Sequence, residues 1–304
     1  MLKQGNCVKT MAAAVSDTLQ ADTGESFLVK RIIAYPGESD EFLTLKVDRK
    51  TVAFYRFRGR GGNQLCSPNY SAGIGNVIDY LIDAGIDVTI PIAEGQILTF
   101  SRLGTGGNIS IIYDCYSAGD IRADMPNGTD SKVYTYLQYM THDGAIAASE
   151  DVLMNTSLTP AEFPEFPCGA VVPAKSKIDI LALVGSPLRD VSGGGAEYCY
   201  TTFIKMIKER ETLFDEDGYG LPFRGDLGGS DGRSYRSKHT LIGASGNTGS
   251  DDVGSNLGKP LIFNPSLVFN SGEELLFYVS VVANADKTFQ TYLDIAAVLR
   301  VTKE

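Results

Sequence analysis

The segment at residues 171–183 reads "VVPAKSKIDILAL": it turns on a proline, offers two lysines to solvent, and then alternates Ile178 and Ile180 with Asp179 before it becomes apolar. Proline fixes φ and lacks the N–H that a sheet ladder needs, so a strand has to begin or end near it. The alternation that follows has the period of two that is typical of a strand with one buried face. The segment therefore predicts a corner that leads into a half-buried strand.

The same arrangement occurs in three further places, at residues 34–45, 89–100 and 267–278, so that each half of the chain has two. Each copy runs from an apolar strand end, through a Pro or Gly turn with a charged residue, into an alternating strand. This chemistry suits a chain that passes around a corner between two sheets. Any antiparallel protein uses Pro and Gly in its turns, but four such corners in two halves predict a duplicated β-sandwich.

Composition narrows the classes of protein. The 304 residues are enough for two cores of ordinary size, and the content of 43% hydrophobic and 21% charged residues is that of a folded chain. The net charge of −10 argues against direct binding to nucleic acid. The five cysteines include no Cys-x-x-Cys pair, so we expect free thiols. No apolar run reaches the roughly 20 residues of a membrane-spanning helix, so we expect no such span.

Short alternating runs predict an all-β chain with six strands in each half. The first-half strands are expected at residues 26–35, 41–47, 51–57, 86–92, 96–103 and 108–116, and the second-half strands at 132–140, 177–184, 197–204, 260–269, 274–283 and 292–301. A short helix is predicted within residues 73–85, where Ile74, Ile78, Leu81 and Ile82 share one face, Asn76 is a plausible cap and Gly85 a plausible stop. A second helix is expected over residues 204–214.

A composition shift over residues 117–131, rich in Gly, Asp, Asn and Pro, predicts the boundary between the halves. The expected organisation is an N-terminal arm at residues 1–21, a first unit at 22–122, a linker at 123–131 and a second unit at 132–304. The second unit contains a Gly-rich insertion, 217–258, with 11 of the chain's 33 glycines. A run of this kind cannot fill a core, so we expect a long surface loop there.

No residue pattern predicts catalysis, a cofactor or a metal, and we expect no enzyme. Only His142, expected in a turn, and His239 exist, which excludes a multi-histidine centre. Asp215 and Asp217 flank a glutamate in "FDEDGYG", a cluster that could attract calcium, but the EF-hand register is missing and a solvated turn is the alternative. Ser245 in "GASGN" does not match a hydrolase nucleophile elbow, and no phosphate-binding loop is present.

One basic stripe stands out in an acidic chain. Arg56, Arg58 and Arg60 are spaced two apart, so on a strand they share one face, while Tyr55 and Phe57 share the other. The stripe could dock onto an acidic neighbour, of which another copy of this chain is the nearest candidate, or onto RNA or anionic lipid. It could equally be an ordinary solvent-exposed face.

In layout, from about residue 22 to its end, the chain resembles the double jelly-roll coat proteins of the adenovirus-hexon-like kind found in tailless icosahedral viruses. The resemblance implies an all-β fold of two jelly-roll sandwiches in tandem, each with a short flanking helix and long surface loops. It also implies a structural major coat protein whose pseudo-hexameric trimers tile an icosahedral shell. A trimer of two-sandwich subunits presents six similar units around one axis, and this explains duplication.

The resemblance further implies the partners: a homotrimer, neighbouring trimers in a lattice, and minor capsid or penton proteins, with contact to an internal membrane left open. The location would be the virion, after assembly in the host cytoplasm. The N-terminal arm would reach a neighbouring copy or the particle interior. The alternative is a tandem β-sandwich binding module that recognises carbohydrate or a receptor, with some of the 15 tyrosines as stacking faces.

Overall fold

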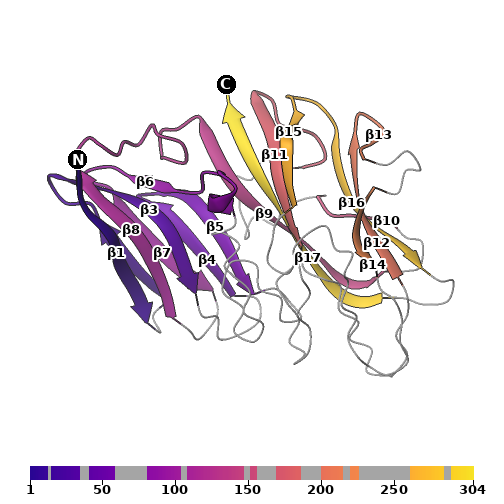
Figure 1. The fold of residues 1–304 in the computed structure, drawn as a ribbon, viewed down its shortest axis with the longest axis horizontal. Helices are drawn as coiled ribbons and strands as arrows, with labels where there is room; N and C mark the ends of the chain where they lie inside the picture. Colours follow the sequence, from indigo (N-terminus) through magenta and orange to yellow (C-terminus); the bar gives the residue numbers. More distant parts are fainter. Residues whose placement is uncertain are drawn as a thin grey trace.

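The structure is a computed structural model that describes residues 1–12, 15–34, 41–58, 81–103, 108–146, 151–155, 169–185, 200–214, 220–225, 261–283 and 289–304. These residues are almost entirely β: they form 17 strands in four antiparallel sheets. Strands β1 to β8 make up two of the sheets and strands β9 to β17 the other two (Figure 1). We name these two sets the N-terminal unit and the C-terminal unit.

The N-terminal unit contains two four-stranded sheets, with the orders β1-β8-β3-β6 and β2-β7-β4-β5. Its buried core takes side chains from both sheets, among them Phe27, Leu43 and Phe100. The strands are β1 (Leu2–Ala12), β2 (Ser16–Gln20), β3 (Glu25–Ala34), β4 (Glu41–Val47), β5 (Lys50–Arg58), β6 (Ile90–Ile92), β7 (Ile97–Leu103) and β8 (Asn108–Ser117).

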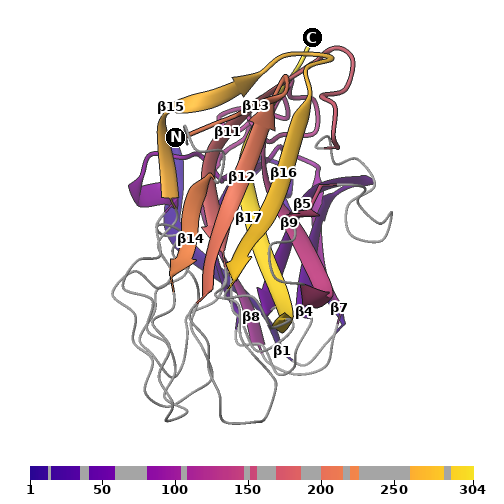
Figure 2. The ribbon, with the colours of Figure 1, turned by 90° about the vertical axis from the view of Figure 1, so that its right-hand side faces the viewer.

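The C-terminal unit repeats this plan with the orders β15-β11-β17-β9 and β10-β16-β12-β13, and β14 also pairs with β12. Figure 2 shows the second of these sheets face-on, at the end of the molecule away from the N-terminal unit. The strands are β9 (Val133–Ile146), β10 (Asp151–Leu153), β11 (Ser176–Gly185), β12 (Tyr200–Lys208), β13 (Glu211–Thr212), β14 (Leu221–Gly225), β15 (Leu261–Phe269), β16 (Leu275–Ala283) and β17 (Phe289–Lys303).

All twelve predicted strands have a counterpart, as β3 to β8 in the N-terminal unit and as β9, β11, β12, β15, β16 and β17 in the C-terminal unit, but β6 covers only residues 90–92 of the expected 86–92. The four predicted corners agree with this topology, because the strands before and after each one belong to facing sheets; residues 35–40 of the first corner lie outside the described residues. Residues 34–45 connect β3 to β4, 89–100 connect β6 to β7, 171–181 lead into β11 after β10, and 267–278 connect β15 to β16.

Backbone hydrogen bonds join two corners of the N-terminal unit, the one between β2 and β3 and the one between β6 and β7. The N–H of Ala21 donates to the carbonyl oxygen of Gln96 at 3.0 Å, and the N–H of Gly95 donates to the carbonyl oxygen of Ala21 at 2.8 Å. Gly95 has a φ of 80°, in the left-handed region that favours glycine. We call this pair of bonds the corner clasp.

The C-terminal unit has the same clasp, and one side of it is the segment with which the sequence analysis began. The N–H of Val172 donates to the carbonyl oxygen of Glu273 at 3.0 Å, and the N–H of Gly272 donates to that of Val172 at 3.0 Å. Gly272 has a φ of 82°. The duplication therefore extends from strand order to individual hydrogen bonds.

A β-bulge lies at the same place in both units. In β3 the pairing with β8 shifts between Val29 and Arg31, and in β11 the pairing with β17 shifts between Ile180 and Ala182. A bulge inserts one residue into a strand and bends it locally. These bulges supply a residue-by-residue equivalence between the two units.

The helix expected over residues 204–214 is wrong. Residues up to Lys208 continue β12, and Glu209 and Arg210 turn the chain with φ values of 49° and 73° into β13. Ile204 and Met206 are fully buried while Lys205 between them is not, which is the period of a strand. The missed signal is a likeness to the β4–β5 hairpin, because "IKERET" at residues 207–212 matches "KVDRKT" at 46–51 in position and turn chemistry.

The N-terminal arm expected at residues 1–21 is not a separate arm. β1 pairs with β8 and β2 pairs with β7, and Met11 and Leu19 are buried in the core of the N-terminal unit. The sequence hid these strands because both lie at sheet edges, where few side chains need to be apolar. β1 and β2, together with β10, β13 and β14, are the five strands that the prediction of six strands in each half did not include.

Three further expectations fall partly on the described residues. Residues 81–83 are helical and Gly85 ends the turn with a φ of 77°, while Asn76 lies outside the described residues. The N–H of Gly85 donates to the carbonyl oxygen of Ile82, and the N–H of Ile86 donates to that of Leu81, which is the Schellman pattern of a helix C-terminus. In the segment 217–258, only residues 220–225 are described, and Leu221–Gly225 form β14; the rest of the expected loop lies outside the described residues. His142 lies within β9, not in a turn.

The clasp gives a test of the duplication. Gly95→Ala and Gly272→Ala should each lower the free energy of unfolding by about 1–2 kcal/mol, because a Cβ is strained at positive φ although neither site is crowded. Gly169→Ala, a control without positive φ and with open space around its Cβ, should change it by less than about 0.5 kcal/mol. Urea unfolding of the three variants measures this. Unequal losses at Gly95 and Gly272 would contradict equivalent clasps.

Candidate functional site

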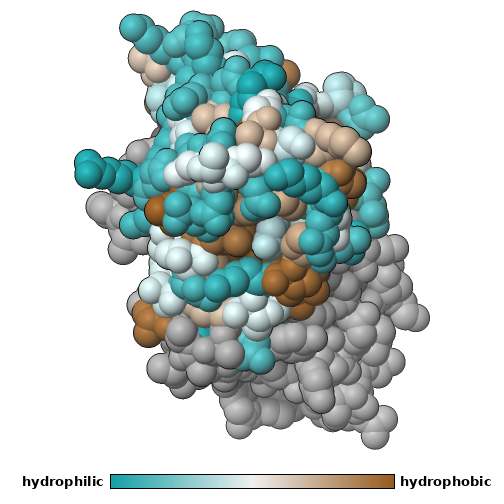
Figure 3. Space-filling view, turned by 90° about the vertical axis from the view of Figure 1, so that its left-hand side faces the viewer, coloured by the Kyte–Doolittle hydropathy of each residue, from teal (hydrophilic) through white to brown (hydrophobic). Residues whose placement is uncertain are grey.

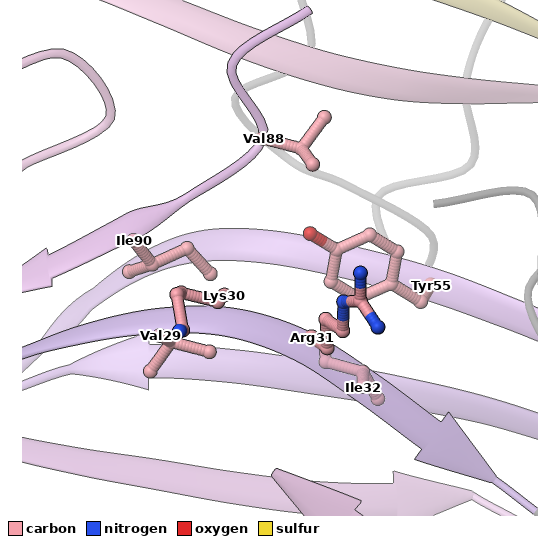
Figure 4. A pocket seen from close by; sticks show the side chains of 7 residues that line it. All are labelled: Val29, Lys30, Arg31, Ile32, Tyr55, Val88 and Ile90. Atoms are coloured by element: carbon pink, nitrogen blue, oxygen red, sulfur yellow. The ribbon is translucent and has the colours of Figure 1, made fainter. Parts of the chain in front are cut away.

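The described residues offer little room for a small ligand. A hollow lies beside β3, and it encloses too little space for a small ligand. Figure 4 shows the side chains that line it: Val29, Lys30, Arg31, Ile32, Tyr55, Val88 and Ile90. Most of this lining is aliphatic or aromatic and belongs to the core.

Most residues that the sequence singled out for chemistry do not gather in the described part of the chain. The backbone of His142 pairs with Leu293, whereas His239, Asp215 and Asp217 lie outside the described residues. So does Ser245. Among the residues that are described, no group of three or more His, Cys, Asp or Glu side chains could hold a metal ion. No helix among them is long and apolar enough to cross a membrane.

The basic stripe falls on β5, as expected for a strand. The backbones of Arg56 and Arg58 pair with β4, and Arg60 lies outside the described residues. β5 is the edge strand of its sheet, so its other side faces away from the ladder. The two units meet at this β5 edge.

The two units meet on one face of the sheet β15-β11-β17-β9. Four side chains of this sheet belong to the same hydrophobic cluster as the N-terminal core: Leu137, Leu181, Ala182 and Val298. Leu137 is 6% exposed and Val298 is fully buried. The opposite face of the same sheet packs into the C-terminal core through Ile180, Leu299 and their neighbours. This sheet is therefore covered on both faces, and in Figure 1 it lies in the middle of the molecule.

The N-terminal unit approaches this face with its β5 edge. β5 runs beside β9, and Phe54 packs against the hydrophobic clusters of both units. Thr44 pairs with Phe54 across the ladder, and the next pair, Leu45 with Ala53, points into the N-terminal core. Phe54 thus projects from the outer side of its sheet into the junction.

Polar bonds fix the linker across the junction. Asn127 is 4% exposed and has a φ of 66°, which asparagine tolerates better than most residues. Its side-chain NH₂ donates to the carbonyl oxygen of Thr89 at 2.9 Å, and its amide oxygen accepts from the N–H of Thr135 at 2.5 Å. One side chain therefore ties the N-terminal unit to the first strand of the C-terminal unit.

Lys50 makes the second tie. Its Nζ donates to the hydroxyl of Tyr134 at 2.6 Å and to the carbonyl oxygen of Thr129 in the linker at 2.7 Å. The ammonium groups of Lys50 and Lys303 lie 4.6 and 5.2 Å from the centroid of the Tyr134 ring. Charged donors make stronger hydrogen bonds than neutral ones, so this contact orients the units as well as joining them.

At the other end of the molecule, the outer face of the sheet β1-β8-β3 is exposed (Figure 3). Val8 is 59% and Leu2 is 49% exposed, and Ile112, which pairs with Val8, is half-buried. Thr10 and Ser110 share a hydrogen bond of 2.8 Å on this face. We call the surface around Val8 and Ile112 the β1 face.

A buried carboxylate sets the backbone under this face. Oδ1 of Asp114, on β8, accepts from the N–H of Asn6 at 2.9 Å and from Nζ of Lys30 at 2.8 Å. Burial raises the pKa of Asp114, but the hydrogen bonds from Lys30 and Asn6 and the charge of Lys30 outweigh it and hold the pKa below its ordinary value. Asn6 and Lys30 lie at irregularities of β1 and β3, so the carboxylate joins three strands where their ladders are broken.

The two cysteines among the described residues, Cys7 and Cys115, are free thiols, as the sequence predicts. Burial is the main cause that raises the pKa of the Cys115 thiol. A raised pKa keeps the thiol protonated and unreactive near neutral pH. The remaining cysteines lie outside the described residues: Cys66, Cys168 and Cys199.

The Lys50–Tyr134 contact should be measurable as a coupling. Lys50→Met and Tyr134→Phe should each lower the free energy of unfolding, and the double variant should show a coupling of about 1 kcal/mol. The exposed ion pair of Lys205 with Asp151 is the control, with an expected coupling below about 0.5 kcal/mol. Chemical denaturation of each cycle tests this. Independent effects of Lys50 and Tyr134 would show that the contact does not join the units.

Asp114 should make stability depend on pH in the acid range. Its stabilising bonds are present in full above about pH 4, the pKa of an unfolded aspartate, and they are lost as the pH falls through the lowered pKa of the folded state. Asp114→Asn should therefore cost about 1–3 kcal/mol at pH 7 and progressively less at lower pH. Urea unfolding from pH 7 to pH 2.5 gives both curves. A pH-independent difference between them would contradict the assignment.

A scan against protein-family models finds no match for this chain, and a search of the curated proteins finds no similar sequence.

Proposed function

We propose that this chain is a double jelly-roll major coat protein, of which three copies associate as a pseudo-hexameric trimer that tiles an icosahedral virus shell. The proposal rests on repeated strand order. In each unit the first strand pairs with the last, the last with the third, and the third with the short sixth strand or its counterpart β15. The facing sheet takes the second, seventh, fourth and fifth positions.

This order supports the jelly-roll assignment. A jelly roll is a sandwich of two four-stranded sheets with eight strands in two Greek keys, which places neighbours in sequence on opposite sheets at the corners. β1 to β8 follow this order strand for strand. β9 to β17 follow it when β13 and β14, which both pair with β12, are counted as two parts of the fifth strand.

The duplication supports the trimer. Corner clasps, β-bulges and the hairpins at Asp48 and Glu209 recur at the same places in both units. Even the bonds of those hairpins correspond: the carboxylate of Asp48 accepts from the N–H of Ile97, and that of Glu209 from the N–H of Glu274. Two units of one design in each chain make six around a three-fold axis, which fits a six-coordinated lattice position.

The function depends on burial and symmetry instead of chemistry at a site. Coat subunits need large complementary surfaces, on the scale of about 1,000 Å² or more for each specific contact. Among the described residues, the exposed β1 face and the outer strands β10 and β13 of the C-terminal unit are two surfaces available for such contacts. The proposal assigns the location to the virion and the partners to other copies of this chain.

The solution mass of the purified chain tests the proposal. Light scattering should give three times the mass of one chain across a tenfold range of concentration, and electron microscopy at high concentration should show sheets or particles with three-fold units. A chain that stays monomeric and binds an immobilised glycan would instead support the tandem binding module. A chain that is monomeric under all these conditions would overturn the coat assignment.

A further inference from the structure

The contact between the two units within one chain is a guide to how two chains could bind each other. Its two sides are the outer face of the sheet β15-β11-β17-β9, with Leu137 and Val298, and the β5 edge, with Phe54. Because the units repeat one design, each side has an equivalent elsewhere in the molecule. One equivalent lies in each unit, at the end of the molecule that is far from the junction.

The first equivalent is the β1 face. Val298 pairs with Ala182, the residue just after the bulge in β11, and Leu137 pairs with Val298 from the other side. In the N-terminal unit Ile112 pairs with Arg31, just after the bulge in β3, and Val8 pairs with Ile112. Val8 is therefore the counterpart of Leu137, and Ile112 that of Val298.

These counterparts differ in what covers them. Leu137 is 6% exposed because the N-terminal unit lies on it, whereas Val8 is 59% exposed. Val298 is fully buried, whereas Ile112 is half-buried. Val8 and Ile112 are both apolar on an outer sheet face, where a solvated strand would favour polar residues. The β1 face is thus the counterpart of a covered face and is left uncovered within one chain, with Lys30 and Arg31 in the places that Leu181 and Ala182 take in the junction.

The second equivalent is the edge at β13. Ala53 lies opposite Leu45, and Leu213 takes the same place in the C-terminal unit because its N–H donates to the carbonyl oxygen of Met206 at 2.8 Å. The next residue is a phenylalanine in both: Phe54 fills the junction, while Phe214 is 48% exposed. The short matching sequences are "TVAF" at residues 51–54 and "TLF" at 212–214.

Phe214 has the character of a binding anchor. Its ring stacks on Phe263 with centroids 5.6 Å apart, which fixes its orientation. A large aromatic side chain held rigidly at a surface loses little entropy when it is buried by a partner. In Figure 1, β13 lies toward the right end of the molecule and β1 toward the left end. The two uncovered surfaces therefore cannot meet within one chain.

We propose that the β13 edge of one copy, with Phe214, binds the β1 face of the next copy, around Val8 and Ile112, and so repeats head-to-tail the contact that joins the two units within each chain. The occupant of the β1 face is a second copy of this chain, because the structure already holds the matching pair of surfaces. A head-to-tail contact generates a ring if its rotation closes. Three copies then alternate N-terminal and C-terminal units around the axis, and every outer face equivalent to the junction is covered.

This inference rests on the proposed trimer and specifies how it is built, so it predicts the behaviour of single-sided variants. Val8→Asp damages the β1 face and leaves the β13 edge intact, and Phe214→Glu does the opposite. Each variant alone should lose at least tenfold in trimer at concentrations where the unaltered chain is trimeric. An equimolar mixture should form a dimer with one chain of each kind, because one intact contact remains between them.

Light scattering of the full-length chains, separately and mixed, gives the masses, and a purification tag on one variant shows that the dimer contains both. Val171→Asp is the matched control, since Val171 is 55% exposed but lies on neither surface, and it should remain trimeric. Thr10→Arg and Glu211→Arg are second variants for the two surfaces, at exposed positions where no buried side chain is lost. Circular dichroism of each variant confirms that it is folded.

The outcomes separate the two proposals. A trimeric Val8→Asp or Thr10→Arg chain, or a mixture of Val8→Asp and Phe214→Glu that stays monomeric, would overturn the head-to-tail contact and leave the trimer standing. An unaltered chain that is monomeric at every concentration would overturn the coat function and the contact together. Dimers that appear only in the mixture would establish both the contact and its polarity.

Discussion

The corner clasp is the constraint on which each unit depends. A sandwich of two sheets needs its crossing connections to lie at fixed places, because a shift of one residue would turn buried side chains outward. The bonds of Ala21 with Gly95 and Gln96, and of Val172 with Gly272 and Glu273, fix two crossings against each other at one end of each sandwich. Each backbone bond contributes only about 1 kcal/mol, but together they set the register of the strands that follow.

Repetition of one design leaves the chain with surfaces of two kinds. The face around Leu137 and the edge around Phe54 are satisfied within the chain, and the ties of Asn127 and Lys50 across the linker hold them together. Their counterparts at Val8 and Phe214 carry apolar side chains without a cover. The chain therefore holds one contact of this kind that is buried, and it exposes the counterparts of both sides of that contact at its two ends.

The parts of the fold that sequence predicts are those where local chemistry suffices. Period-two alternation located β11 and β17, and Gly85 was identified as the stop of a helix whose end is described. The edge strands β1 and β2 were missed because partners far along the chain, not their own side chains, make them strands. The hairpin at Glu209 was missed because its apolar residues also fit a helical spacing, and only comparison with Asp48 reveals it.

The junction could not be predicted from sequence at all, since nothing in the pattern of β9 or β17 tells which unit covers which face. Leu137 and Leu299 are both apolar and on neighbouring strands, yet they face different cores. Such assignments follow from the path of the linker and from the bulges, which are properties of the folded chain. The resemblance in layout implied an all-β chain of sandwiches, which the four antiparallel sheets agree with, but it implied no residue of the contact.

Pairing of the first strand with the last has a consequence for synthesis on the ribosome. β9 finds its neighbour only when β17 has been translated, more than 140 residues later, and β17 also fills the gap beside β11. Until then the sheet β15-β11-β17-β9 lacks one of its two inner strands, while all eight strands of the N-terminal unit have already been translated. The two units therefore obtain their last strands at different times, the N-terminal unit with β8 and the C-terminal unit only with β17.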